Sequence, residues 1–268
     1  MSSNITVLKF GGSVLSGAGA LPGVAEEILR ESRRGRRVLV VVSAFAGVTD
    51  ALDALSRRFV GPEDRHVARL LATGEATSSA LLAMQLKEIR VSNAVLDPRE
   101  LGLYTTGPRL DASPVSVDVD RLIDRLNEVD AVIVGGFVAC GKDGALTLLG
   151  RGGSDLSAVF LAHQLDAREC RLIKDVPGVF PADPKLASTL AYPYAELSFE
   201  RALEIAGVVV QAKAVRYARR HGRAFRVCGA NAPHGTLVGP FEDRLITKDD
   251  ARSRAIGLTG PDIAEFPA

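Results

Sequence analysis

The sequence predicts an α/β fold built on a largely parallel, buried sheet. Short runs rich in apolar and β-branched residues alternate with longer segments of helical periodicity, and several of these runs end in glycine. Parallel strands are covered on both faces by crossover helices, so they read as nearly continuous apolar runs, as Val38–Val42 does. The chain has 268 residues, enough for one large domain or two small ones.

The periodicity assigns each segment of the chain to an element. We expect strands at Ile5–Phe10, Arg37–Val42, Ser92–Leu96, Ala131–Val134, Arg171–Ile173 and Ala224–Val227. We expect helices at Pro22–Arg33, Thr49–Arg57, Glu63–Leu86, Asp120–Asn127, Ser154–Leu165, Ser198–Ile205 and Lys213–His221. Pro22 suits the first turn of its helix, and Ser154 and Ser198 suit N-caps.

A hairpin and a lobe boundary are predicted near the middle of the chain. Val138–Cys140 and Ala145–Leu149 flank Gly141-Lys142-Asp143-Gly144, and Asp-Gly between apolar runs is a strong hairpin signal. No linker separates independent halves, so we expect one fold with two lobes that meet near Gly150. The tail from about Phe241 is polar and is not expected to add strands.

Charge and composition exclude several classes of protein. Thirty-three Lys and Arg residues against 32 Asp and Glu give a formal net charge of +1, so no global field attracts nucleic acid or an anionic membrane. The apolar runs are far shorter than a membrane span of about 20 residues, and the first ten residues do not resemble a secretory signal. We therefore expect a cytoplasmic protein, with Cys140, Cys170 and Cys228 as buried thiols and no metal site.

Three glycine-bearing turns follow predicted strands, where open parallel sheets bind ligands. The first, Lys9 to Ser13, contains Gly11 and Gly12, whose amides can approach phosphate oxygens while Lys9 supplies a cation. It matches neither a Walker A loop nor the dinucleotide fingerprint, and a Gly-Gly pair is also compatible with a simple turn. The second, Ser43 to Thr49, either accommodates a ligand against the backbone or caps a helix at Thr49.

The third turn carries the strongest signal for an anion. Gly150-Arg151-Gly152-Gly153-Ser154-Asp155 leads directly into a predicted helix, whose N-terminus has about half a positive charge and free N–H groups. Arg151 can add a bidentate grip on a carboxylate or phosphate, and chain reversal alone does not require a guanidinium there. Asp155 either belongs to this site or complements the helix dipole.

Two further acidic positions are candidates. Glu75 follows Gly74 in a helix and lies close to its apolar face, where a buried carboxylate needs a partner such as a ligand ammonium; a surface glutamate is the alternative. Lys174 and Asp175 end a predicted strand and precede a proline- and glycine-rich segment that reaches Asp183 and Lys185. Turn chemistry explains its prolines and Gly178 but not its charged ends.

The order of these motifs resembles the catalytic domain of the aspartokinases, in the amino-acid kinase superfamily. The motifs are KFGGS at 9–13, VVVSAFAGVTDAL at 40–52, GE at 74–75, GRGGSD at 150–155, DVPGVFPADPK at 175–185 and LSFERALEIAG at 197–207. The resemblance runs from about Ile5 to Val238. It implies an αβα three-layer sandwich with a mainly parallel sheet, a phosphoacceptor lobe at about 1–150 and a nucleotide lobe at about 151–240.

The resemblance also implies a reaction, in which the γ-phosphoryl group of ATP, with Mg²⁺, moves to the side-chain carboxylate of L-aspartate. Lys9 would then neutralise the transferring group, and Asp155 would orient the charged network. The implied phosphate contacts come from Gly11, Gly12 and Ser13. The implied acceptor site comprises Ser43, Glu75, Arg151, Gly152, Gly153 and Ser154. The implied ATP site comprises Lys174, Asp175, Phe180, Asp183 and Lys185.

The chain departs from the aspartokinase pattern at three places. Ala76 stands where the family has an arginine, and Val208 stands where it has a nucleotide-contacting lysine. Lys174 replaces the usual threonine, and the related uridylate kinases resemble this chain in having a lysine there. Lys174 is therefore a candidate for supplying the cation lost at Val208.

The resemblance leaves several properties as expectations. The match stops about 30 residues before the last residue, so we expect no ACT domains and no feedback inhibition by lysine or threonine. Family members commonly form homodimers. The alternatives to an aspartate kinase are a specialised kinase for another small acid and a non-catalytic protein that binds a nucleotide or an amino acid.

Overall fold

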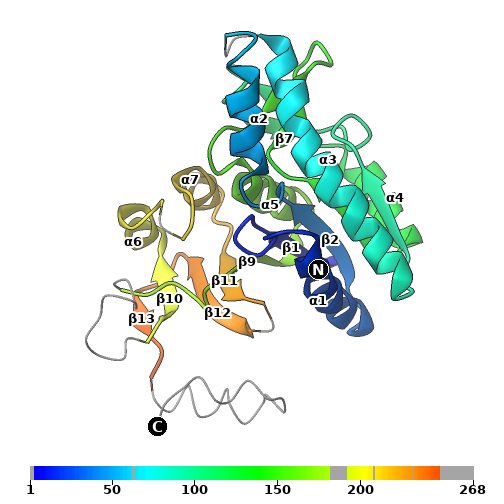
Figure 1. The fold of residues 1–268 in the computed structure, drawn as a ribbon. Helices are drawn as coiled ribbons and strands as arrows, with labels where there is room; N and C mark the ends of the chain where they lie inside the picture. The colour runs from blue at the N-terminus through cyan, green and yellow to red at the C-terminus, as the bar shows by residue number, and fades with distance from the viewer. Residues whose placement is uncertain (1–2, 62–63, 182–191, 208, 231, 248–268) are drawn as a thin grey trace.

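The fold is a three-layer arrangement in which helices cover both faces of a large, mainly parallel sheet (Figure 1). It comes from a computed structural model that describes residues 3–61, 64–181, 192–207, 209–230 and 232–247. The predicted fold class is confirmed.

The large sheet has nine strands in the order β13-β10-β12-β11-β9-β1-β2-β6-β3. Their bounds are β1 Ser3–Phe10, β2 Arg37–Val42, β3 Asn93–Leu96, β6 Ala131–Gly135, β9 Ala167–Lys174, β10 Tyr194–Ser198, β11 Phe225–Gly229, β12 Ala232–Gly239 and β13 Arg244–Leu245. The six strands from β11 to β3 are all parallel, while β12 runs antiparallel to β11 and β13 runs antiparallel to β10. The carboxyl ends of the six parallel strands therefore lie along one edge.

Successive side chains of each strand point to opposite faces of the sheet, and this divides the core into two layers. Val7 and Leu39 face the helices α4 (Val119–Glu128), α5 (Gly153–Gln164), α6 (Phe199–Glu204) and α7 (Ala212–Arg220). Leu8 and Val40 face α1 (Leu21–Arg33) and α3 (Arg65–Glu88). Lys9 has the parity of Val7, so its side chain emerges on the α5 face of the sheet. α2 (Val48–Ser56) packs against α3 (Figure 1).

A smaller sheet contains the predicted hairpin. β7 (Val138–Cys140) pairs antiparallel with β8 (Leu146–Leu148), and β4 (Tyr104–Thr106) and β5 (Ser113–Ser116) extend the sheet in the order β5-β4-β7-β8. The turn between β7 and β8 has Gly144 at a φ of +71°, the left-handed conformation that glycine adopts readily. The Asp-Gly signal is thus confirmed.

The structure confirms some predicted helix ends and contradicts others. Ser198 does cap its helix, because its hydroxyl accepts a hydrogen bond from the Arg201 N–H at 3.1 Å, and Pro22 lies in the first turn of α1. By contrast, α5 is capped by Gly152 rather than Ser154, and α2 by Gly47 rather than Thr49, because both glycines adopt positive φ at the turn into the helix. The tail was not expected to form strands, yet β13 pairs with β10. Strands β4, β5, β10 and β12 were also missed.

A buried ion network fixes α1 against β9. The Arg171 side chain is 1% exposed and lies 3.0 Å from Glu27 and 2.8 Å from Glu31 of α1, whose carboxyl groups are also buried. Arg34 and Arg36 also contact the Glu31 carboxylate, each at 2.6 Å. Burial alone would raise the pKa of Glu31, but these guanidinium groups outweigh burial and hold the pKa below its ordinary value.

We expect Arg171→Ala to destabilise the fold by about 3–5 kcal/mol, because it leaves two buried carboxylates without their shared partner. Denaturant unfolding at pH 7 measures this change. Arg125→Ala, which removes only an exposed pair with Glu128, should cost less than about 1 kcal/mol. Folding lowers the pKa of Glu31, so this residue contributes to the free energy of unfolding above pH 4.5, the pKa that it has in the unfolded chain. The contribution is lost as the pH falls through the pKa of the folded state.

If Arg171→Ala fails to fold, the triple variant Arg171→Met, Glu27→Gln, Glu31→Gln removes the uncompensated charge and should recover the folded state. An Arg171→Ala protein within about 1 kcal/mol of the unmodified chain would contradict the assigned role.

Candidate functional site

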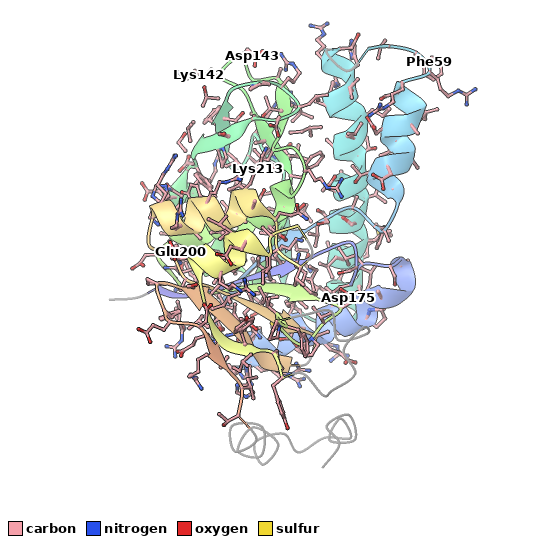
Figure 2. The ribbon with its side chains drawn as sticks, turned by 90° about the vertical axis from the view of Figure 1, so that its left-hand side faces the viewer. Phe59, Lys142, Asp143, Asp175, Glu200 and Lys213 are labelled. Carbon is pink, nitrogen blue, oxygen red and sulfur yellow. The ribbon has the colours of Figure 1, made fainter. Side chains whose placement is uncertain are left out.

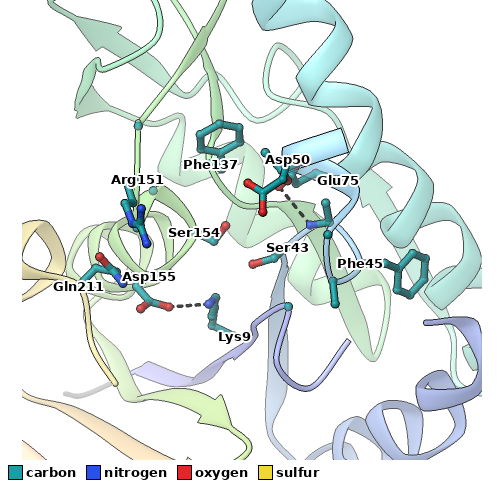
Figure 3. A pocket seen from close by; sticks show the side chains of 18 of the residues that line it. Lys9, Ser43, Phe45, Asp50, Glu75, Phe137, Arg151, Ser154, Asp155 and Gln211 are labelled. Atoms are coloured by element: carbon teal, nitrogen blue, oxygen red, sulfur yellow. Dashed lines mark hydrogen bonds and ion pairs between the residues drawn. The ribbon is translucent and has the colours of Figure 1, made fainter. Parts of the chain in front are cut away.

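A pocket of about 330 Å³ lies at the carboxyl edge of the parallel strands (Figure 3). Its floor is formed by Lys9 at the end of β1 and Lys174 at the end of β9, and its walls by the turn after β2, by Glu75 of α3 and by the amino end of α5. Side chains from both halves of the sequence thus line one cavity. This is the edge at which open α/β sheets bind ligands.

An ion cluster occupies the floor. The Lys9 Nζ lies 2.5 Å from Asp155 Oδ1, and Lys174 Nζ lies 2.9 Å from Asp155 Oδ2. Asp155 is in the first turn of α5, facing Lys9 (Figure 3). Its side chain is 3% exposed. Two ammonium groups therefore share one carboxylate at a helix N-terminus, which leaves the floor with an excess of positive charge.

The two lysines keep this carboxylate ionised. Burial alone would raise the pKa of Asp155, but the ammonium groups of Lys9 and Lys174 outweigh burial and hold the pKa below its ordinary value. Burial, reinforced by Lys174, lowers the pKa of Lys9, while Asp155 opposes this shift. The cluster can therefore present cationic hydrogen-bond donors to an anion in the pocket.

Glu75 offers a carboxylate on another wall. The residue is 3% exposed, its Oε1 accepts from the Ala44 N–H at 3.1 Å, and its buried Oε2 has no hydrogen-bond partner among the described residues. Burial raises the pKa of Glu75 to about 7, and the Ala44 N–H opposes the shift. A buried acceptor with a free oxygen is suited to a ligand that brings a donor or a positive charge.

Two glycines allow this placement of Glu75. A Cβ atom on Gly74 would lie 2.8 Å from the Ala44 Cβ, so only glycine lets α3 approach the turn after β2 this closely. A Cβ atom on Gly135 would lie 3.0 Å from the Glu75 Cβ. Ser78 ties the same elements together, because its hydroxyl donates to the Ser43 carbonyl at 2.8 Å. The sequence signal at Gly74-Glu75 thus coincides with a packed, buried carboxylate.

The turn at 150–155 brings its predicted residues into the pocket. Arg151, Gly152, Gly153, Ser154 and Asp155 all line it, and the exposed Arg151 makes no ion pair within the part of the chain that the structure describes. A Cβ atom on Gly152 would lie 2.3 Å from the Gln211 Cβ, so the turn also packs closely against the start of α7. The guanidinium of Arg151 is therefore available to a ligand.

The first two turns contribute unequally. Gly12 lines the pocket, and Gly11 lies beside Lys9, where an added Cβ would be 2.9 Å from the Lys9 Nζ. Ser13 is exposed and does not line the pocket. In the second turn, Ser43 lines the pocket together with Ala44, Phe45, Ala46, Gly47 and Thr49.

Most of the predicted ATP contacts lie away from the pocket or outside the described residues. Lys174 lines the pocket, whereas Asp175 is exposed (Figure 2) and Phe180 is half-buried outside it. Asp183, Lys185 and Val208 lie outside the described residues. Ala76 is exposed and does not line the pocket, although its neighbour Glu75 does.

Three further residues that the sequence pattern did not predict line the pocket. They are Asp50 in the first turn of α2, Phe137 after β6 and Gln211 at the N-cap of α7. Asp50 directly follows Thr49 in a motif already singled out. Phe137 has a φ of +67°, a strained conformation for a bulky residue that no sequence pattern reveals.

The described residues contain neither a metal cluster nor a membrane span. No group of three or more His, Cys, Asp or Glu side chains among them could hold a metal ion. No helix among them is long and apolar enough to cross a bilayer. The three cysteines are free and buried, as predicted.

Comparison with known proteins places the chain in a family. A profile of the amino acid kinase family matches residues 4–228. The aspartokinase of Mycolicibacterium smegmatis is 34% identical over 281 residues, which cover 98% of this chain and 66% of that protein. The structure of Escherichia coli aspartokinase III in complex with aspartate and ADP superposes with a TM-score of 0.76 at 27% identity, covering 89% of this chain and 65% of that one.

A more distant structure agrees with the fold alone. UMP kinase from Bacillus anthracis superposes with a TM-score of 0.65 at 18% identity, over 92% of this chain and all of that one. The chain spans slightly less than two thirds of the two aspartokinases. The profile match covers most of the sequence, and the chain belongs to the amino acid kinase family.

Proposed function

We propose that the protein is an ATP-dependent kinase that phosphorylates the side-chain carboxylate of L-aspartate. One observation supports this most strongly: a single pocket holds the Lys9–Asp155–Lys174 cluster on its floor, with Glu75 and Arg151 on its walls. The floor suits phosphate, and the walls suit a small molecule that carries both an ammonium and a carboxylate. The similarity to aspartokinases makes aspartate the first acceptor to consider.

The acceptor is proposed to bind through its charged groups. Glu75, with one free buried oxygen, would receive the ammonium, and Arg151 would hold the α-carboxylate through its paired N–H groups. Ser43, Gly152, Gly153 and Ser154 would complete the wall around them. Both of these groups are attached to the Cα atom, so binding them leaves the side-chain carboxylate at the other end as the group that can approach the phosphate.

In the reaction, an oxygen of that carboxylate forms a bond to the γ-phosphorus while the bond from the γ-phosphorus to the β,γ-bridging oxygen breaks. The products are aspartyl phosphate and ADP, and no proton transfer is required. Catalysis of phosphoryl transfer consists mainly of positioning and charge stabilisation. Lys9 would neutralise charge on the transferring group, the Gly11, Gly12 and Ser13 amides would hold phosphate oxygens, and Asp155 would orient Lys9.

ATP is proposed to extend from the floor toward the second half of the chain. Lys174 is the family-atypical cation and would contact the phosphates, and Asp175, Phe180, Asp183 and Lys185 would surround the rest of the nucleotide. Among the described residues no group of three or more His, Cys, Asp or Glu could hold a metal ion, so the proposed Mg²⁺ would keep several waters and be held largely by substrate phosphates. When bound, Mg²⁺ neutralises phosphate charge.

The wider properties follow from the family resemblance. We propose a phosphoacceptor lobe up to about Gly150, a nucleotide lobe beyond it, and a homodimer acting in the cytoplasm on free amino acid and ATP.

The direct test measures ADP release by the purified protein with MgATP and a panel of acidic amino acids and related acids, with hydroxylamine present to trap acyl phosphate. Turnover with L-aspartate well above all other acids is expected. Preferred turnover with another acid would contradict aspartate as the substrate. ATP binding without turnover on any acid would contradict the kinase.

Glu75→Gln should raise the aspartate KM by about 10- to 100-fold with a smaller change in kcat, because one charge-assisted contact to the ammonium is lost. In the unmodified protein the aspartate KM should rise as the pH falls below about 7, since protonation of Glu75 removes its charge. Glu75→Gln should abolish that dependence. Glu88→Gln, at the exposed end of the same helix, is the matched control, and an unchanged pH profile in Glu75→Gln would contradict the assignment.

Lys174→Ala should raise the ATP KM, lower kcat, or both, with a total loss in kcat/KM of about 10- to 100-fold, because a cation beside the phosphates is removed. Steady-state kinetics with ATP varied measure the effect. Lys142→Ala, on the exposed hairpin (Figure 2), is the control. Unchanged ATP kinetics in Lys174→Ala would show that Lys174 does not take over the role of the family lysine.

A further inference from the structure

A second pocket, of about 350 Å³, lies at the opposite edge of the sheet. It is lined by Arg36 just before β2, by Arg168 and Glu169 at the start of β9, and by Arg223 and Arg226 around the start of β11. These are the amino ends of parallel strands, whereas the first pocket is at their carboxyl ends. The two pockets have no residue in common.

The charges that line this pocket are unbalanced. Four arginines face it, and Glu169 is the one carboxylate among its described lining residues. Glu169 is already shared, because Arg226 lies 3.1 Å from it, Arg171 3.5 Å and Arg36 3.7 Å. Two carboxylates outside the lining also contact these arginines, since Glu31 lies 2.6 Å from Arg36 and Asp166 lies 3.5 Å from Arg223, but positive charge remains in local excess.

The arginines are held in place before any ligand binds. The side chains of Arg36, Arg223 and Arg226 are 21, 17 and 23% exposed. Arg223 donates to the Ala167 carbonyl and lies 3.5 Å from Asp166, and Arg226 donates to the His234 carbonyl at 3.1 Å. These contacts already restrict the side chains, so less side-chain conformational entropy is lost when a ligand binds.

Two arginines retain unused capacity. The buried Nε of Arg223 has no hydrogen-bond partner among the described residues. Arg168 is exposed and makes no ion pair within the described part of the chain. Guanidinium groups stay charged at any physiological pH, so neighbouring arginines repel one another unless an anion joins them.

We propose that this pocket binds a small anion with at least two negative charges, whose oxygens engage Arg36, Arg168, Arg223 and Arg226. The shared chemistry is a compact polyvalent oxyanion, either a phosphate compound or a polycarboxylate, because guanidinium groups bind both in the same paired geometry. A pocket volume of about 350 Å³ is suited to a small molecule. The site is separate from the proposed acceptor and ATP sites.

Isothermal titration calorimetry with inorganic pyrophosphate and with citrate, at low salt and without substrates, tests the proposal and separates the two sources of anion. We expect saturable binding of at least one probe, weakened by added salt. The double variant Arg223→Gln, Arg226→Gln should weaken this binding at least about tenfold. Arg125→Gln, an exposed arginine on α4, should leave it unchanged.

Glu169→Gln should change the probe affinity in the direction opposite to that of the arginine double variant. It removes the carboxylate that competes for the arginines, so the same probe should bind about two- to fivefold more tightly. A variant that merely loosened the fold would bind more weakly, so this result separates a binding role from a structural one. Thermal unfolding of each variant without probe confirms that it is folded.

The double variant Arg151→Gln, Lys174→Ala assigns the binding to one of the two pockets, because it removes from the first pocket the cations proposed to hold carboxylate and phosphate. The proposal requires that this variant leave the probe affinity unchanged, since Arg151 and Lys174 line only the first pocket. The proposal is overturned by loss of binding in this variant or by equal affinity in the Arg223 and Arg226 double variant. It is also overturned if neither probe binds saturably up to about 10 mM, or if only a single-stranded oligonucleotide binds.

Discussion

The Lys9–Asp155–Lys174 cluster is the interaction on which the candidate site depends. It joins the carboxyl ends of β1 and β9 to the first turn of α5, so three separate parts of the chain are held at one point. A buried carboxylate is costly unless it is paired, and here two lysines pair with it. Because there are more ammonium groups than carboxylates, the cluster keeps positive charge available for phosphate. In the proposed function, residues at the walls would then decide which acceptor fits.

The sequence predicted those parts of the fold and site that depend on local pattern. Continuous apolar runs located β1, β2 and β6, and Asp143-Gly144 located the hairpin, because these signals act within a few residues. Strands β4, β10 and β13 were missed because they are at most five residues long and are defined by pairing with neighbouring strands rather than by a pattern in their own residues. Arg151 and Glu75, which the sequence marked as candidate site residues, both line the first pocket.

Features that arise only from tertiary packing were not predicted. In the sequence, nothing distinguishes Arg171, Glu27 and Glu31 from ordinary charged surface residues, yet all three side chains are at most 3% exposed. Phe137 and Gln211 reach the first pocket from segments about 74 residues apart, a proximity that no single-sequence pattern encodes. The arginines at 36 and 223 likewise meet only because parallel strands align their amino ends at one edge.

The central claim is that Asp155 acts by orienting the lysines for phosphoryl transfer, and Asp155→Asn tests it most directly. The rate of aspartyl hydroxamate formation and the Kd of ATP are measured for this variant and for Asp143→Asn on the exposed hairpin. We expect a loss in kcat of about 100-fold or more with ATP binding retained, because Lys9 and Lys174 lose the carboxylate that orients them, and Lys9 also loses the charge that opposes the lowering of its pKa. A kcat within about twofold of the unmodified protein would contradict it.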